Sequence, residues 1–359
     1  MKSYLNLKEE VWDKETCSGC GACVSVCPTE NIYFKQQSPV QFDCDECACI
    51  IVPTENGESP ISAEFCKVTL YDVNCGACYN ACPRTKERHI FNLEKVPGRV
   101  IENYKAKSTL ETKNIQSGGV VTAILANAFD EDLIDGAIVM MEDKWTMDPK
   151  SYLATSKEDV LKTAGSRYNW NVPILEVLKE AVMVKKLNKI AVVGTPCVIN
   201  AVYQMMATNN DLVEPFKKAI RLKISLFCFE TFDYDKMLKK LKEVEVNPWD
   251  IKKMEIDKGK LIVSTIHGNV FNFKIDEMDE YVRKGCKVCR DFTGISSDIS
   301  VGNVGTPEGY STVLVRNKWG KGFFDRAVIN GYVSVEGEAS IDPVISLSKK
   351  KMERKDIEF

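Results

Sequence analysis

Residues 17–28 read CSGCGACVSVCP, which places four cysteines and a proline in the spacing C-x2-C-x2-C-x3-C-P. This spacing is typical of a peptide that wraps a cubane iron–sulfur cluster, because three thiolates can bind one cluster while Gly19 and Gly21 permit the tight turn between them. The fourth cysteine of such a run binds a different cluster. The segment therefore predicts a fold organised around metal, with zinc and disulfides as the alternative uses of the same cysteines.

A second cysteine run, CGACYNACP, follows at residues 75–83, but Asp72 stands where the first cysteine of the pattern is expected. In bacterial-type ferredoxins the two runs exchange their last ligands. We therefore expect one cluster to take Cys17, Cys20, Cys23 and Cys82, and the other to take Cys27, Cys75, Cys78 and one further ligand. We prefer Cys66 to Asp72 for that ligand, because thiolate is the softer ligand for iron, although a carboxylate could serve.

Three more cysteines, Cys44, Cys47 and Cys49, lie between the two runs in the stretch FDCDECAC. Together with Cys66 they would make a four-thiolate set, which would leave Asp72 to complete the second ferredoxin cluster. The alternative is an insertion whose thiols are free or weakly structural. The iron content of the ferredoxin part distinguishes these possibilities, at about eight irons for two clusters and about twelve for three.

Composition narrows the classes of function. A net charge of -3 over 359 residues gives no electrostatic footprint for nucleic acid. The chain begins MKSYLNLKEE, without an apolar signal segment, and contains no apolar run long enough to cross a bilayer. We therefore expect a cytoplasmic protein whose 15 cysteines are reduced and bind metal, rather than a disulfide scaffold. Peripheral association with a membrane complex stays open.

The distribution of cysteines divides the chain. Eleven of the 15 lie at or before Cys82, so residues 1–92 are predicted to form a small α+β bacterial-type ferredoxin domain with a cysteine-containing insertion. Residues 93–115 have the composition of a linker. Residues 116–340 alternate helix-like and strand-like segments, such as a helix at 120–129 and strands at 190–193 and 222–227, which predicts an α/β domain with a mixed sheet. Residues 341–359 are predicted to be a charged tail, either a solvated helix or a frayed end.

Four dispersed cysteines belong to the second domain: Cys197 in GTPC, Cys228 in SLFCFET, and Cys286 and Cys289 in GCKVC. Only the last pair has metal-ligand spacing by itself, and a lone C-x2-C is also typical of a redox dithiol. Cys197 and Cys228, however, each follow an apolar strand, and the carboxyl ends of parallel strands meet at one edge of a sheet. Four thiolates gathered there are enough for a cubane cluster.

The order of segments in the second domain is similar to that of a known family. QSGGVVTAILANAFDEDLIDGAIV, AGSRYNWNVPILEVLKEAV, VVGTPCVINAVYQM, LFCFETFDY, DKGK, GCKVCRDF and GNVGTPEGYSTV resemble the beta subunit of coenzyme F420-reducing hydrogenase over about residues 116–320. The ferredoxin-like extension resembles the input subunit of F420H2 dehydrogenase and the F420H2-oxidising half of F420-dependent sulfite reductase. The resemblance implies FAD, coenzyme F420 as substrate, and one [4Fe-4S] cluster near the flavin, held by Cys197, Cys228, Cys286 and Cys289.

Several loops have the residue types that a flavin needs, which are close backbone approach and donors for phosphate. The candidates come from QSGG, AGSRY, GTPC, DKGK and GNVGTP: Ser117, Gly118, Gly119, Val120, Ser166, Arg167, Tyr168, Thr195, Lys258, Lys260, Asn303 and Gly305. The two lysines could instead meet the acidic tail of F420. Each loop also has a plainer interpretation, as a helix start, a helix-end loop, a turn or a surface pair of lysines.

The chain contains no Gly-x-Gly-x-x-Gly dinucleotide motif and no phosphate-binding loop with its lysine, and no catalytic side chain is predicted. The resemblance implies hydride exchange between F420 and FAD, followed by single-electron transfer through [4Fe-4S] clusters to or from a partner complex. Two alternatives stay open: a ferredoxin-linked flavin reductase similar to 7-hydroxymethyl chlorophyll reductase, and a non-catalytic electron relay. The direction of electron flow, the partner and the oligomeric state are not predicted.

Overall fold

A computed structural model describes residues 2–34, 58–86, 96–112, 115–170, 173–355 and 358. Cys44, Cys47 and Cys49 lie outside the described residues, so whether they bind metal stays a prediction. Within the described ranges, no helix is both long enough and apolar enough to cross a membrane.

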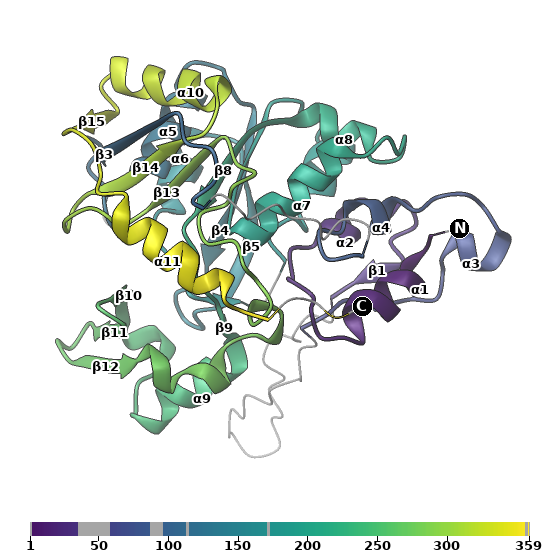
Figure 1. The fold of residues 1–359 in the computed structure, drawn as a ribbon, viewed down its shortest axis with the longest axis horizontal. Helices are drawn as coiled ribbons and strands as arrows, with labels where there is room; N and C mark the ends of the chain where they lie inside the picture. The colour runs from purple at the N-terminus through teal and green to yellow at the C-terminus, as the bar shows by residue number, and fades with distance from the viewer. Residues whose placement is uncertain are drawn as a thin grey trace.

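The larger domain is built on an eight-stranded sheet in the order β15-β3-β14-β13-β8-β7-β4-β5 (Figure 1). The inner strands β13, β8, β7 and β4 are parallel, whereas β5 at one side and β14, β3 and β15 at the other pair antiparallel. The predicted mixed sheet is confirmed. The strands are β3 (Glu102–Ser108), β4 (Gly136–Glu142), β5 (Pro149–Ala154), β7 (Ile190–Gly194), β8 (Ile220–Leu226), β13 (Ile299–Gly302), β14 (Ser311–Val315) and β15 (Val333–Val335).

Helices cover both faces of this sheet. β7 is buried along its whole length, and its side chains alternate: Ala191 and Val193 join one apolar core, while Ile190 and Val192 join the other. The first core includes α5 (Val120–Asp130), α6 (Lys157–Lys162) and α10 (Lys318–Ile329). The second includes α7 (Pro196–Ala207), α8 (Glu214–Ala219) and the short helix Glu180–Val184.

The N-terminal domain packs against that second core (Figure 1, purple). Its elements are α1 (Tyr4–Leu7), the helical turn Lys8–Trp12, α2 (Ala22–Ser25), β1 (Ile32–Tyr33), β2 (Ile61–Ser62), α3 (Lys67–Tyr71) and α4 (Ala77–Ala81), with β1 and β2 antiparallel. Gly21 lies so close to Pro173 that a Cβ atom at position 21 would stand 2.6 Å from the proline Cβ. Leu175 N also donates a hydrogen bond to Cys20 O at 3.0 Å. The cysteine loop is therefore part of the interface between the domains.

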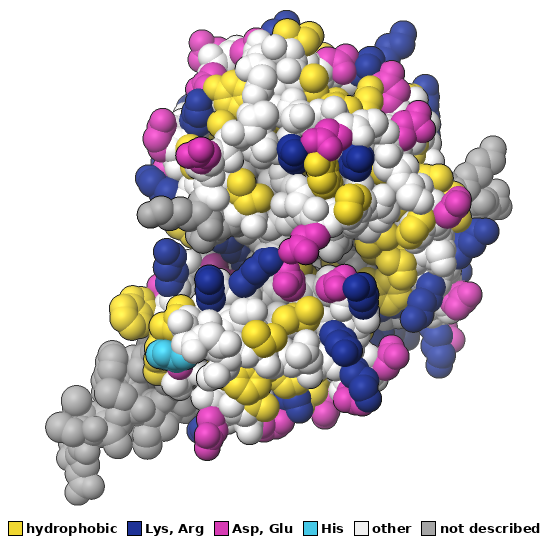
Figure 2. All heavy atoms as spheres, turned by 90° about the vertical axis from the view of Figure 1, so that its left-hand side faces the viewer, with side chains coloured by type: hydrophobic (Ala, Val, Ile, Leu, Met, Phe, Trp, Pro, Cys, Tyr) yellow, Lys and Arg dark blue, Asp and Glu magenta, His cyan; other side chains and the backbone are white. Residues whose placement is uncertain are grey.

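A separate layer lies below the main sheet and contains a three-stranded antiparallel sheet, β10-β11-β12 (Figure 1). β11 and β12 form a hairpin about residues 267–269, with Thr265 N donating to Asn269 O. The elements of this layer are β6 (Asn169–Trp170), β9 (Phe232–Asp233), α9 (Tyr234–Glu243), β10 (Ile251–Asp257), β11 (Lys260–Thr265) and β12 (Val270–Lys274). Figure 2 shows a furrow between this layer and the sheet domain, with basic and acidic side chains along its lower edge.

The structure differs from the sequence-based boundaries at two places. The segment expected to be a linker contains β3, which pairs with β14 and β15 inside the main sheet. Most of its side chains are only half-buried and several are charged, so the apolar pattern of a core strand is missing. The segment expected to be a solvated tail contains α11 (Asp342–Met352), whose Val344, Ser348 and Lys351 are buried.

Candidate cluster sites and cofactor loops

Twelve of the cysteines lie in the described part of the chain, and all twelve are free thiols. They fall into three neighbouring groups of four. No three Cys, His, Asp or Glu side chains among the described residues are arranged to hold a single metal ion. Four thiolates are the ligand set of a cubane cluster.

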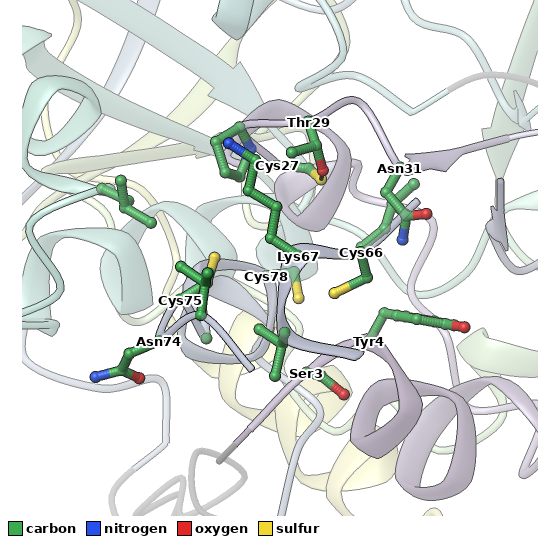
Figure 3. Close-up of a pocket in the computed structure, with 16 residues that line it drawn as sticks. Ser3, Tyr4, Cys27, Thr29, Asn31, Cys66, Lys67, Asn74, Cys75 and Cys78 are labelled. Atoms are coloured by element: carbon green, nitrogen blue, oxygen red, sulfur yellow. Dashed lines mark hydrogen bonds between the residues drawn. The ribbon is translucent and has the colours of Figure 1, made fainter. Parts of the chain in front are cut away.

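The group furthest from the sheet lines a cavity of about 200 Å³ (Figure 3). Cys27, Cys66, Cys75 and Cys78 all contribute to its wall. Cys66 lies at the N-terminus of α3, and its sulfur points into the cavity (Figure 3). Asp72 lies at the opposite end of that helix, where it is exposed and does not line the cavity. Burial raises the pKa of Cys78, and repulsion from Cys27, Cys75 and Cys66 raises it further.

The second group consists of Cys17, Cys20, Cys23 and Cys82, the set that the exchange of ligands between the two runs predicts. Burial raises the pKa of Cys17 to about 11, and the thiolate of Cys20 adds to this effect. Burial also raises the pKa of Cys23, with further contributions from Cys17, Cys20 and Cys82. These thiols would therefore ionise only with a cation between them, which a cluster would supply.

The third group lies at the carboxyl edge of the main sheet. β7 and β8 are adjacent and parallel, so Cys197 at the start of α7 and Cys228 just after β8 share one edge, as the sequence predicts. Cys286 and Cys289 come from the short helix Lys284–Cys286 and the turn that follows it. Burial raises the pKa of Cys197 to about 12, and repulsion from Cys289 and Cys286 contributes. The Thr195 hydroxyl lies 3.2 Å from the Cys197 sulfur, beside this group rather than at a separate site.

The second and third groups are in direct contact through the backbone. A Cβ atom at Gly285 would stand 1.9 Å from Cys17 O, so only glycine fits there. Arg283, which is 1% exposed, donates from Nη1 to Ser18 O at 2.9 Å across the same contact. The loop CSGC of the N-terminal domain therefore touches the loop GCKVC of the larger domain.

Two buried cations at the third group are not predicted from the sequence. Arg84 directly follows the Cys82-Pro83 pair, and its Nη1 and Nη2 donate to Val288 O at 3.2 Å and Gly285 O at 3.4 Å. Lys351 on α11 donates to Cys228 O at 2.5 Å and to Asp291 O at 2.8 Å. The position of Arg84 directly after a cluster motif is a sequence signal that it lies near a cluster. No local sequence pattern indicates that Lys351 lies near one.

Two of the proposed cofactor loops, QSGG and AGSRY, meet beside β10. Gln116 Nε2 donates to the Tyr168 hydroxyl at 3.4 Å and to Met254 O of β10 at 3.0 Å, which joins the QSGG and AGSRY loops to β10. Gly119 has a left-handed φ of 67° and precedes α5, whose first residue is Val120. Gly118 N donates to the Ser311 hydroxyl at 3.1 Å, and a Cβ atom at Gly118 would stand 2.6 Å from Ala106 O. Packing alone therefore requires glycine at 118.

The AGSRY loop holds its arginine inward. Arg167 Nη1 donates to Thr163 O at 2.7 Å and to Gly165 O at 2.6 Å, while Ser166 is exposed. Burial lowers the pKa of Arg167. Burial also raises the pKa of Glu142, although the charge of Arg167 partly opposes this effect. Sequence reasoning missed Glu142, although a carboxylate at the carboxyl end of a central strand is a recognisable signal.

The remaining candidates lie at the surface or are explained by packing. Lys258 and Lys260 are exposed at the turn between β10 and β11, at φ 45° for Lys258. Asn303 is exposed as well. Gly305 has φ 96°, and a Cβ atom there would stand 2.2 Å from Ser340 O. The glycine at 305 is thus fixed by its contact with the chain before α11.

A mixed α/β domain with four free thiols at its sheet edge, in contact with a ferredoxin-like domain, defines an iron–sulfur oxidoreductase component. Comparison with known families narrows this class. Residues 103–179 and 187–340 match the N-terminal and C-terminal regions of the coenzyme F420 hydrogenase/dehydrogenase beta subunit, and residues 10–33 match a 4Fe-4S binding domain. The chain belongs to the family of coenzyme F420 hydrogenase/dehydrogenase beta subunits.

Individual relatives agree with this family. The chain is 63% identical over 357 residues to an uncharacterized protein of Methanocaldococcus jannaschii, with 99% of each chain covered. It is 33% identical to a subunit of the F(420)H(2) dehydrogenase of Methanosarcina mazei, with 88% of this chain and 83% of that protein covered. A chain of the F420-reducing [NiFe] hydrogenase complex from Methanosarcina barkeri superposes with a TM-score of 0.68 at 33% identity, covering 72% of this chain and 90% of that one.

Proposed function

We propose that this chain is the subunit of an F420-linked oxidoreductase that exchanges a hydride with coenzyme F420 and passes single electrons to or from a partner complex. The observation that carries the proposal is the row of three cysteine groups, because the second and third touch at Gly285 and Cys17. When bound, FAD accepts or donates the hydride and releases electrons singly, and [4Fe-4S] clusters carry them one at a time.

The three groups of thiols would hold one cluster each. The donor chemistry fits, because each group offers four free cysteines, and four thiolates are the ligand set of a cubane cluster. For the outer cluster we propose Cys66 as the fourth ligand, since it lines the cavity that Cys27, Cys75 and Cys78 share. Asp72 would then end α3 without binding a cluster.

The glycine-rich and AGSRY loops would hold FAD and F420. The N-terminus of α5 would offer backbone amides to phosphate, Gly118 and Gly119 form the turn that leads into it, and Ser117, Ser166, Arg167 and Tyr168 would offer polar contacts around it. Lys258 and Lys260 are exposed and would attract the acidic tail of F420. For Asn303, Gly305 and Thr195 a cofactor contact remains a proposal, and the contacts of Gly305 and Thr195 described above do not require one.

The outer cluster would face the partner. α3 has no buried residue, and four large apolar side chains within nine positions are exposed around the cavity: Phe65 at 64%, Leu70 at 49%, Tyr71 at 67% and Val73 at 47%. Exposed apolar groups gathered at one site mark an interaction surface. We propose that this apolar patch, defined as Phe65, Leu70, Tyr71 and Val73, docks the redox partner.

One experiment separates this function from its alternatives. The protein is purified anaerobically, its absorption spectrum is recorded, and F420H2 is added. Bleaching of a bound flavin supports the proposal. A bound flavin that F420H2 does not bleach favours a flavin reductase of another substrate, and clusters without flavin favour an electron relay.

A further inference from the structure

The C-terminal helix places a lysine inside the protein, next to the third cysteine group. Lys351 is 1% exposed, and its Nζ donates to the carbonyl oxygens of Cys228 and Asp291. Cys228 is itself a proposed cluster ligand, and Asp291 lies two residues after the ligand Cys289. The ammonium group thus fixes the backbone of two segments that carry cluster ligands.

Burying an ammonium group without an anionic partner is costly. Within the described ranges, no carboxylate lies at ion-pair distance from Lys351 Nζ. The third cysteine group, whose Cys228 carbonyl the ammonium contacts, would supply the compensating negative charge once its thiolates bind a cluster.

A second buried cation, Arg84, also lies beside the third group, where it donates to Val288 O and Gly285 O. The two cations differ in position, however. Arg84 is close to Cys82 of the neighbouring group as well as to Cys289, so it acts on two clusters, whereas Lys351 contacts the third group only.

The rest of α11 holds Lys351 in place. Val344 is buried, and Ile341 and Leu347 pack beside it against Phe292 and Leu314 (Figure 1, yellow). Beyond the helix, Arg354 donates to Cys286 O and to Phe229 O and pairs with Glu230. The family match ends at residue 340, before α11 begins. The helix lies outside the matched regions and contacts the cluster site through Lys351.

We propose that Lys351 is a positioning residue for the cluster held by Cys197, Cys228, Cys286 and Cys289. Its two hydrogen bonds fix the ligand-bearing backbone, and its positive charge favours one-electron reduction of this cluster, because each reduction adds one negative charge. The proposal rests on the proposed function only in requiring that a cluster is bound there. The charge of Lys351 would therefore raise the midpoint potential of this cluster above the value set by its thiolate ligands alone.

The test compares substitutions on one helix of the full-length, cluster-loaded protein. Lys351→Gln keeps a hydrogen-bond donor but removes the charge, Lys351→Arg keeps the charge, and Lys349→Gln removes the same charge from an exposed site on α11. The readouts are iron content and the midpoint potential of each cluster from an anaerobic redox titration followed by electron paramagnetic resonance. Neither readout requires F420.

We expect Lys351→Gln to retain its iron but to lower the ratio of reduced to oxidised third cluster about tenfold at a fixed potential, which corresponds to about 59 mV for one electron. Lys351→Arg and Lys349→Gln should stay near the unmodified protein. Equal potentials for Lys351→Gln and Lys349→Gln would overturn the proposal. If Cys197→Ala loses no iron, the cluster itself is absent, and the proposed function fails before Lys351 is tested.

Discussion

Replacing Gly285 with alanine tests the contact between the two cysteine loops. The new Cβ atom would stand 1.9 Å from Cys17 O, whereas ordinary contact begins at 3.4 Å, so the loops must separate by 1.5 Å, which is 3.4 minus 1.9. The obstacle is backbone on both sides, so no flexible side chain can move away. A separation of this size would also break the hydrogen bond from Arg283 to Ser18 O, now 2.9 Å long.

Overpacking costs about 1–3 kcal/mol, and loss of a charged hydrogen bond costs about 1.5–3 kcal/mol. We expect Gly285→Ala to destabilise the protein by about 3 kcal/mol and to lower its melting temperature by roughly 6 °C. The assay is anaerobic thermal unfolding followed by circular dichroism.

Gly322→Ala is the matched control for this substitution. Gly322 lies in α10 with nothing within 4 Å of its added Cβ, and alanine there should stabilise the helix by up to about 1 kcal/mol. If Gly285→Ala melts within 1 °C or so of the unmodified protein, the close contact between the cluster loops is wrong.

Three further substitutions test the proposed electron path. Cys197→Ala should leave flavin reduction by F420H2 intact but stop delivery to a one-electron acceptor; unimpaired delivery would contradict the order of the cofactors. Cys66→Ala should lose about four irons per chain while Asp72→Ala loses none, because only Cys66 lines the outer cavity; the opposite pattern would make Asp72 the ligand. Tyr71→Glu should slow electron delivery to the partner complex at least about tenfold without changing flavin bleaching, whereas Ile329→Glu, an exposed apolar residue on α10, should not; equal rates for both variants would remove the apolar patch from the docking surface.

The sequence predicts the two-domain architecture well because spacing and periodicity are local properties. The spacing of four cysteines in the ferredoxin run predicts that it binds a cluster. The apolar strands that precede Cys197 and Cys228 predict that both cysteines lie at one edge of the sheet. The boundaries were less predictable. β3 was expected to be linker, because an outer strand with half-buried, charged residues lacks an apolar pattern.

The glycine-rich loops show a different limit. A glycine in the sequence indicates close approach of something to the backbone, but it does not say of what. At Gly118 and Gly305 the neighbour is the protein itself, namely Ala106 O and Ser340 O. Their contact with a cofactor accordingly remains a proposal, whereas the need for glycine has a structural explanation.

By itself, the sequence determined which residues can bind iron, since ligand chemistry and spacing are written in the residue types. Only the tertiary structure decided which groups become neighbours. It brought Cys66 rather than Asp72 to the outer cavity, set Gly285 against Cys17, and folded a lysine from the charged C-terminal segment onto Cys228. Such contacts join residues far apart in the chain, and no local pattern encodes them, because they depend on how separate elements pack.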